Sequence, residues 1–186
     1  MGQRYPALND GHVRFIEEQH LFFVATAMAD GRVNLSPKGM DALRVLSPER
    51  VLWLNVTGSG NETATHLQHN PRMTLMFCAF AGKPLILRLY GQARAIHQGD
   101  AEWEALAALL PALPGARQLF DLTVELVQSS CGMSVPFMDY QGEREQLNDW
   151  AKAKGPEGIR QYWQDRNQTS LDGVASGIVE KSRQQR

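Results

Sequence analysis

The residues best suited to chemistry lie in one Gly-rich loop, residues 57–63 (TGSGNET). Its two glycines allow a ligand to approach the backbone closely, and the start of the predicted helix that follows presents unpaired N–H groups that favour anions. The residue order matches neither the GxxxxGK[ST] loop nor the GxGxxG fingerprint of nucleotide-binding proteins. The loop is therefore either a phosphate cradle or an ordinary capped turn. The members that could contact a ligand are Thr57, Ser59, Gly60, Asn61 and Thr63.

A second segment with suitable chemistry is 34–39 (NLSPKG). The alternation of residues 32–36 places Asn34 and Ser36 together on one face of a strand, with apolar residues on the other. Lys38 follows, and a cation beside backbone amides is the usual way to balance the charge of a phosphate. The alternative is that Lys38 is an ordinary surface lysine.

Two other groups of reactive side chains lack partners in the sequence. His66 and His69 are spaced to share one helical face, but zinc needs a third ligand that is not evident, so two solvated histidines are favoured. Cys131 follows two serines, yet no base is identifiable, and burial as a small apolar side chain is favoured. We therefore expect no metal site, and the catalytic residues stay unassigned.

Composition limits the classes of partner. The 186 residues are enough for one domain, and 19 Lys plus Arg against 20 Asp plus Glu leave a formal charge of −1. So small a charge disfavours nucleic acid or an anionic membrane as the partner. No run is apolar enough for a signal peptide or a membrane span, and the two cysteines do not form a secreted disulfide framework, so we expect a cytoplasmic protein.

The hydrophobic pattern predicts short strands with few helices between them. Because strands and helices do not alternate regularly, it favours an antiparallel sheet or small barrel, mainly β or α+β, with peripheral helices. A less regular stretch separates the second and third strands, Gly91 indicates a bulge, and Asn61 is expected to cap a helix with its side chain. The predicted strands are 21–27, 32–36, 50–56, 72–80, 85–96 and 119–127, and the predicted helices are 12–19, 62–69, 101–110, 143–154 and 157–166.

Taken in order, NLSPKG (34–39), RVLWLNVTGSGNETATHLQHNPRMTLMFCAF (50–80) and LILRLYGQARAI (85–96) resemble the pyridoxamine 5'-phosphate oxidase-like flavoproteins. The resemblance covers about residues 10–135. It implies an antiparallel split β-barrel that forms a homodimer, with FMN at the subunit interface. Residues 1–140 would be the FMN-binding domain, and residues 141–186 a helical extension that packs on the barrel or on the partner.

The same resemblance implies a set of cofactor contacts. The phosphate would lie near Lys38 and the 57–63 loop. Asn34, Ser36 and Asn55 would line the ribityl chain and the ring, and Arg88 would come from a neighbouring strand.

The sequence also departs from the vitamin B6 enzymes of this family. Glu62 and Thr63 stand where those enzymes have basic residues, and their WRxxRL segment is absent. The resemblance therefore implies a separate branch, and an FMN-dependent oxidoreductase with an unknown small-molecule substrate. The alternatives are a non-catalytic flavin- or haem-binding protein for storage, sensing or transfer on the same fold, a relative that uses deazaflavin, and a dimeric structural module with an empty cleft.

Overall fold

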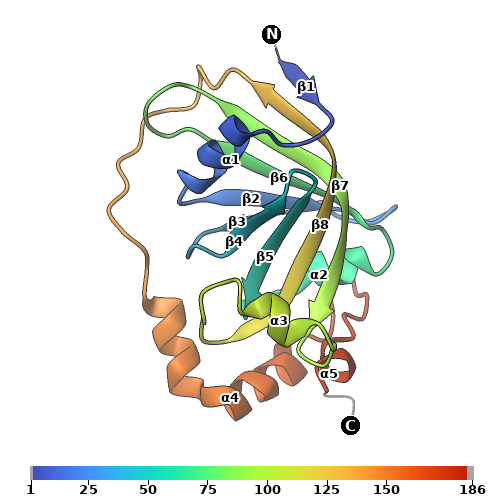
Figure 1. The fold of residues 1–186 in the computed structure, drawn as a ribbon. Coiled ribbons are helices and arrows are strands. Elements are labelled where there is room, and N and C mark those ends of the chain that lie inside the picture. The colour runs from blue at the N-terminus through green and yellow to red at the C-terminus, as the bar shows by residue number, and fades with distance from the viewer. Residues whose placement is uncertain (1, 184–186) are drawn as a thin grey trace.

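The computed structural model describes residues 2–183, so residues 1 and 184–186 of the two expected regions lie outside it. A strongly curved sheet forms the body of the molecule, with helices around its rim (Figure 1). The strands are β1 (Gln3–Tyr5), β2 (Phe22–Thr26), β3 (Asn34–Lys38), β4 (Leu43–Ser47), β5 (Arg50–Val56), β6 (Arg72–Cys78), β7 (Ile86–His97) and β8 (Ala116–Ser130). The helices are α1 (Asp10–Glu17), α2 (Glu62–Leu67), α3 (Trp103–Ala107), α4 (Gln146–Arg166) and α5 (Ile178–Lys181).

The sheet is antiparallel throughout, in the order β3-β2-β6-β7-β8-β5-β4, and β1 pairs with β8. β3 and β4 are consecutive in the chain but lie at opposite ends of this order. The sheet therefore curls into a barrel that is open between them. The expected antiparallel architecture with peripheral helices is confirmed.

The continuous apolar run of β5 is explained by its position between two cores. Val51 and Trp53 point into the barrel interior, whereas Leu52 and Leu54 pack beneath α3. A strand that is buried on both faces needs no polar alternation. β5 therefore holds its last polar residue, Asn55, in a buried position.

The structure also corrects the predicted elements. The stretch that was expected to be irregular before Pro48 contains β4, an edge strand whose residues Leu43 to Leu46 are all half-buried. The short strand β1 and the short helix α5 were not predicted. The bulge at Gly91 is confirmed, because the register of β7 against β8 shifts there and a Cβ would lie 1.9 Å from the carbonyl oxygen of Thr123.

The predicted separation of two C-terminal helices at Gly155-Pro156 is confirmed, because α4 consists of two helical parts joined by a break there. The break is at Gly155, whose φ of 64° lies outside the helical region and favours glycine. α4 runs beneath the barrel beside α5, with which it shares a small core (Figure 1). Within residues 2–183, no helix is both long and apolar enough to cross a membrane.

Candidate functional site

Strand β3 has an inverted pattern of polar and apolar residues. Asn34, Ser36 and Lys38 pair with the inward-facing residues of β2, whereas Leu35 points outward and is 63% exposed. Val33, just before the strand, is 71% exposed. The predicted sharing of one face by Asn34 and Ser36 is confirmed, and that face is the interior.

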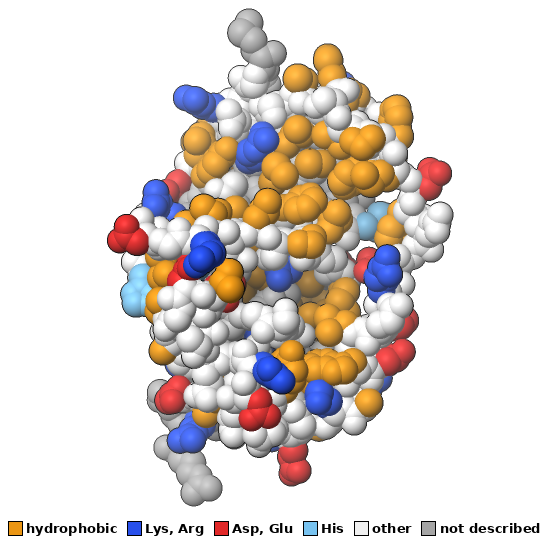
Figure 2. Space-filling model, turned by 180° about the vertical axis from the view of Figure 1, so that it is seen from behind, with side chains coloured by type: hydrophobic (Ala, Val, Ile, Leu, Met, Phe, Trp, Pro, Cys, Tyr) orange, Lys and Arg blue, Asp and Glu red, His pale blue; other side chains and the backbone are white. Residues whose placement is uncertain are grey.

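The outward face is apolar well beyond β3. Ala25 lies opposite Leu35 in the sheet, and Phe23 lies opposite both Pro37 and Met76, so these side chains share one surface. Figure 2 shows hydrophobic side chains spread across one side of the molecule. Exposed apolar surface of this kind marks an interaction site.

Lys38 reaches inward to a chain of buried amides. Its Nζ donates to Oδ1 of Asn55 at 3.2 Å and lies 5.6 Å from the ring centre of Trp53. Nδ2 of Asn55 donates to Oε1 of Gln118 at 3.3 Å, and Nε2 of Gln118 donates to Oδ1 of Asn61 at 3.0 Å. Burial and the nearby charge of Arg117 lower the pKa of Lys38 to about 8.

Arg117 is a second cation in the same network, and it is more deeply buried than the half-buried Lys38. It is 2% exposed, and its Nε donates to Oε1 of Gln118 at 2.9 Å. Its two other nitrogens donate to Oδ1 of Asn167 at 2.7 Å and to the carbonyl of Gly60 at 2.9 Å. Burial lowers the pKa of Arg117 to about 10. Among residues 2–183, no carboxylate lies within ion-pair distance of Arg117 or Lys38.

The start of the Gly-rich loop is hydrogen-bonded to α4. Thr57 donates its hydroxyl to the carbonyl of Gly115 at 2.8 Å and accepts the indole N–H of Trp163 at 2.8 Å. Asn61 does begin α2, but the expected side-chain cap is wrong: its oxygen accepts from Gln118 instead, and its buried Nδ2 has no partner within the described chain. The side chain of Asn61 therefore bonds to Gln118 instead of capping α2.

The remaining predicted contacts fall into two places. Asn34 donates to the hydroxyl of Thr63 at 3.1 Å, which ties β3 to α2 beside the loop. Ser36 is half-buried on the same face of β3, and the carbonyl of the exposed Ser59 accepts from Asn167. Arg88 lies on the outward face of the sheet, opposite Met76, and donates to the hydroxyl of Ser130 at 3.1 Å. Hydrogen bonds thus link Lys38 to Asn55 and, through Gln118, to Asn61, and they link Asn34 to Thr63, whereas Arg88 lies on the opposite face of the sheet.

Two expectations about reactive side chains were wrong. His66 is buried rather than solvated, with its Nδ1 3.1 Å from the hydroxyl of Thr26, although His69 is exposed as expected. Cys131 is exposed rather than buried, since β8 has ended at Ser130. Within residues 2–183, no group of three or more His, Cys, Asp or Glu side chains could hold a metal ion.

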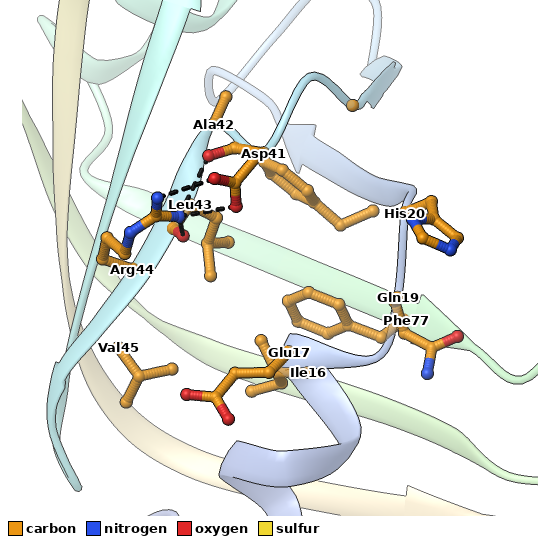
Figure 3. A pocket seen from close by; sticks show the side chains of 12 residues that line it. Ile16, Glu17, Gln19, His20, Asp41, Ala42, Leu43, Arg44, Val45 and Phe77 are labelled. Carbon is orange, nitrogen blue, oxygen red and sulfur yellow. Dashed lines mark hydrogen bonds and ion pairs between the residues drawn. The ribbon is translucent and has the colours of Figure 1, made fainter. Parts of the chain in front are cut away.

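A cavity of about 290 Å³ lies at the opening of the barrel, between α1, the start of β4, and β2 with β6 (Figure 3). Ile16 and Phe77 give it an apolar wall, and Glu17 lies at its edge. Among the described residues that line it, the one arginine or lysine is Arg44, which donates to both carboxylate oxygens of Asp41 at 2.7 Å. Its positive charge is already compensated, so this cavity is less suited to an anion than the Lys38 network.

Sequence reasoning missed three residues of the network, namely Arg117, Gln118 and Asn167. The first two precede the apolar alternation of residues 119–127 and look like part of a turn, although β8 begins at Ala116. Asn167 follows the last turn of α4. A buried arginine has no local signature, because only the fold decides that it is buried.

Comparison with known proteins now identifies the family. A family model described as "Pyridoxamine 5'-phosphate oxidase" matches residues 8–131. The chain belongs to the pyridoxamine 5'-phosphate oxidase family. Over 188 aligned residues it is 35% identical to "Pyridoxamine 5'-phosphate oxidase family protein ustO" of Aspergillus flavus, a match that covers 91% of this chain and 76% of that protein.

Solved structures support the family's fold. A putative pyridoxamine 5'-phosphate oxidase from Lactobacillus delbrueckii superposes with a TM-score of 0.53 at 20% identity, over 66% of this chain and 94% of that one. HupZ of Group A Streptococcus gives 0.54 at 21% identity, over 66% and 98%. The FAD binding protein of Mycobacterium smegmatis gives 0.50 at 15% identity, over 67% and 96%. At these identities the likeness is one of fold, and it confirms the split barrel.

Proposed function

We propose that this protein is a homodimer that binds FMN and acts as an FMN-dependent oxidoreductase on a small molecule. The observation that carries the proposal is a pair of cations, the half-buried Lys38 and the buried Arg117, with no carboxylate of residues 2–183 within ion-pair distance of either. Burial of a charge without a counter-charge costs a free energy of roughly several kcal/mol. A phosphate dianion would supply the missing negative charge.

The donors around the Gly-rich loop fit such a phosphate. Nδ2 of Asn61, which is 2% exposed, has no acceptor within residues 2–183. Ser59 and Gly60 are exposed, so a ligand can reach the loop from solvent. The hydroxyl of Thr63 accepts from Asn34 and keeps its own hydrogen for a ligand, whereas Thr57 already donates its hydroxyl to Gly115 and so supports the loop. Asn61 and Thr63, with Lys38 and the backbone of Ser59 and Gly60, would hold the phosphate.

The rest of the flavin would lie along β3. Asn34, Ser36 and Asn55 would bind the ribityl chain and the ring, and Arg88 would contribute from the outward face of the sheet. The flavin would supply hydride or electron transfer, while the protein positions it and sets its potential through nearby charge and hydrogen bonds. Lys38, held by Asn55, would place one positive charge beside it.

The exposed apolar face supports a dimer. Val33 and Leu35 each expose more than half of their surface, and they lie next to Phe23 and Pro37. A second copy of the chain would cover this face and would bring its own outward residues, Arg88 included, to the site.

The visible spectrum of the purified protein, followed by titration with FMN and with riboflavin, tests the binding. We expect flavin absorption bands, or FMN binding at least about tenfold tighter than riboflavin binding because of the phosphate. No FMN binding would overturn the proposal.

Turnover separates an enzyme from a carrier. We expect flavin reduction by reduced nicotinamide or another donor, and reoxidation by an acceptor. If FMN binds but no donor or acceptor of a panel supports turnover, the protein is a non-catalytic flavin-binding protein. If haem binds and FMN does not, the proposed cofactor is wrong.

A further inference from the structure

Asn167 is a buried residue that joins the C-terminal segment to the candidate phosphate site. It is 0% exposed and lies beyond residues 8–131, the part that the family model matches. Its Oδ1 accepts from Arg117 at 2.7 Å, and its Nδ2 donates to the carbonyls of Gly58 at 3.1 Å and Ser59 at 3.3 Å. One amide therefore contacts both the buried cation and the loop.

These bonds orient the loop. The carbonyls of three consecutive residues, Gly58, Ser59 and Gly60, are occupied by Asn167 and Arg117. The backbone N–H groups of residues 58–61 have no acceptor within the described chain. With its carbonyls held on the α4 side, the loop keeps its donors for another partner, as an anion site requires.

Asn167 is itself rigidly placed. It ends α4, where its N–H donates to the carbonyl of Trp163 at 3.0 Å, and its own carbonyl accepts from the hydroxyl of Ser176 at 2.5 Å. Its side-chain amide therefore has little freedom to leave Arg117. The position is built by the C-terminal segment rather than by the barrel.

The neutrality of Asn167 is important, because several other arginines of this chain are paired with carboxylates. Arg44 bonds to Asp41, and both Arg50 and Arg94 bond to Asp121. Arg117, which is more deeply buried, is held by an amide of the same shape as aspartate but without its charge. Each of its three side-chain nitrogens has an acceptor, and its positive charge is left for a ligand.

We propose that Asn167 is a positioning residue for phosphate recognition: it holds Arg117 and the Gly58–Gly60 loop in place without neutralising the cation. The C-terminal segment thereby takes part in cofactor selection in its own subunit. This inference rests on the proposed FMN binding.

Affinities of Asn167→Ala and Asn167→Asp for FMN and riboflavin, measured by fluorescence titration, test it. Alanine removes the three hydrogen bonds, and aspartate also adds a negative charge beside Arg117. The ratio of FMN affinity to riboflavin affinity should fall in the order wild type, Asn167→Ala, Asn167→Asp, by about tenfold or more for the aspartate variant.

Gln168→Glu is the matched control, because the neighbouring exposed glutamine gains the same charge away from Arg117. Its ratio should equal that of the wild type. Parallel losses of FMN and riboflavin in the Asn167 variants, or an unchanged ratio, would overturn the inference, since a purely structural residue affects both ligands alike. A wild-type protein that fails to prefer FMN would instead contradict the proposed phosphate site.

Discussion

The indole N–H of Trp163 donates to the hydroxyl of Thr57 at 2.8 Å, although 106 residues separate them. This bond fastens α4 to the first residue after β5, where the Gly-rich loop begins. Both residues are buried, so water cannot replace either partner. The bond should therefore contribute measurably to the free energy of unfolding.

Thr57→Val keeps the shape of the side chain but leaves the indole N–H without an acceptor. We expect a loss of about 1–3 kcal/mol in the free energy of unfolding, because a buried donor then lacks a partner. In a double-mutant cycle with Trp163→Phe, measured by urea unfolding, the coupling should be about 1 kcal/mol. Strictly additive losses would show that the contact contributes nothing.

Lys38→Ala should weaken FMN binding by about tenfold or more and leave riboflavin binding nearly unchanged, because only FMN carries the phosphate. Isothermal titration of both ligands measures the difference. Lys83→Ala, in the exposed turn before β7, removes the same charge elsewhere and should bind both ligands as the wild type does. Equal losses for FMN and riboflavin in the Lys38 variant would exclude the phosphate contact.

The lowered pKa of Lys38, about 8, predicts a pH dependence of FMN affinity. As the pH rises through this value the free protein loses the positive charge, while the phosphate stays dianionic above about pH 6. FMN affinity should therefore be nearly constant between about pH 6 and the pKa of Lys38 and decline above it, by up to about tenfold per pH unit. Lys38→Ala should show a flat profile in this range, and a decline that survives the substitution must come from another group.

Asp121 accepts hydrogen bonds from Arg50 at 2.8 Å and from Arg94 at 2.8 Å. Burial alone raises the pKa of this carboxyl, but the two arginines more than offset burial, so the pKa lies below its ordinary value of 3.8. A carboxyl whose pKa is lowered in the folded state stabilises the fold above that ordinary value. The contribution is lost as the pH falls through the lowered pKa.

Asp121→Asn should therefore cost about 1–3 kcal/mol at neutral pH, reduced because both arginines are partly exposed to water. Below about pH 4 the difference from the wild type should shrink. Urea unfolding over a pH series measures both. Asp41→Asn, in the exposed pair with Arg44, is the control and should change stability much less. A pH-independent loss at Asp121 would contradict the linkage.

Leu35→Lys should weaken the proposed dimer without unfolding the protein, because its side chain is exposed in one protomer. Sedimentation velocity over a dilution series should show more monomer than for the wild type. Leu109→Lys, just beyond α3, adds the same charge on another exposed leucine and should leave the assembly unchanged. A dimer unaffected by lysine at Leu35 would place the interface elsewhere.

The parts of the site that could be predicted are those with a local pattern. The alternation around Asn34 and Ser36 revealed their shared face, because neighbouring strand residues alternate whatever the rest of the fold does. Lys38 and the Gly-rich loop were recognisable as residue types. Nothing local showed that these polar residues face the barrel interior and that Leu35 faces out.

The missed residues meet only in three dimensions. Arg117 and Asn167 are 50 residues apart, and each also bonds to the loop near Gly60. Likewise, the side chain of Asn61 was expected to bond to its own helix, but its oxygen accepts from Gln118, which comes from a distant strand. A local rule fails where a distant side chain competes for the same atom.

The inverted pattern of β3 makes its register against β2 decisive. Lys38 pairs with Phe22, and Leu35 pairs with Ala25. A slip by one residue would turn every side chain of β3 to the opposite face. The lysine would move outward and the apolar residues inward, so the ligand site and the apolar exterior would be lost in the same event. A register error at this edge therefore could not remove the candidate site and still leave the apolar face exposed.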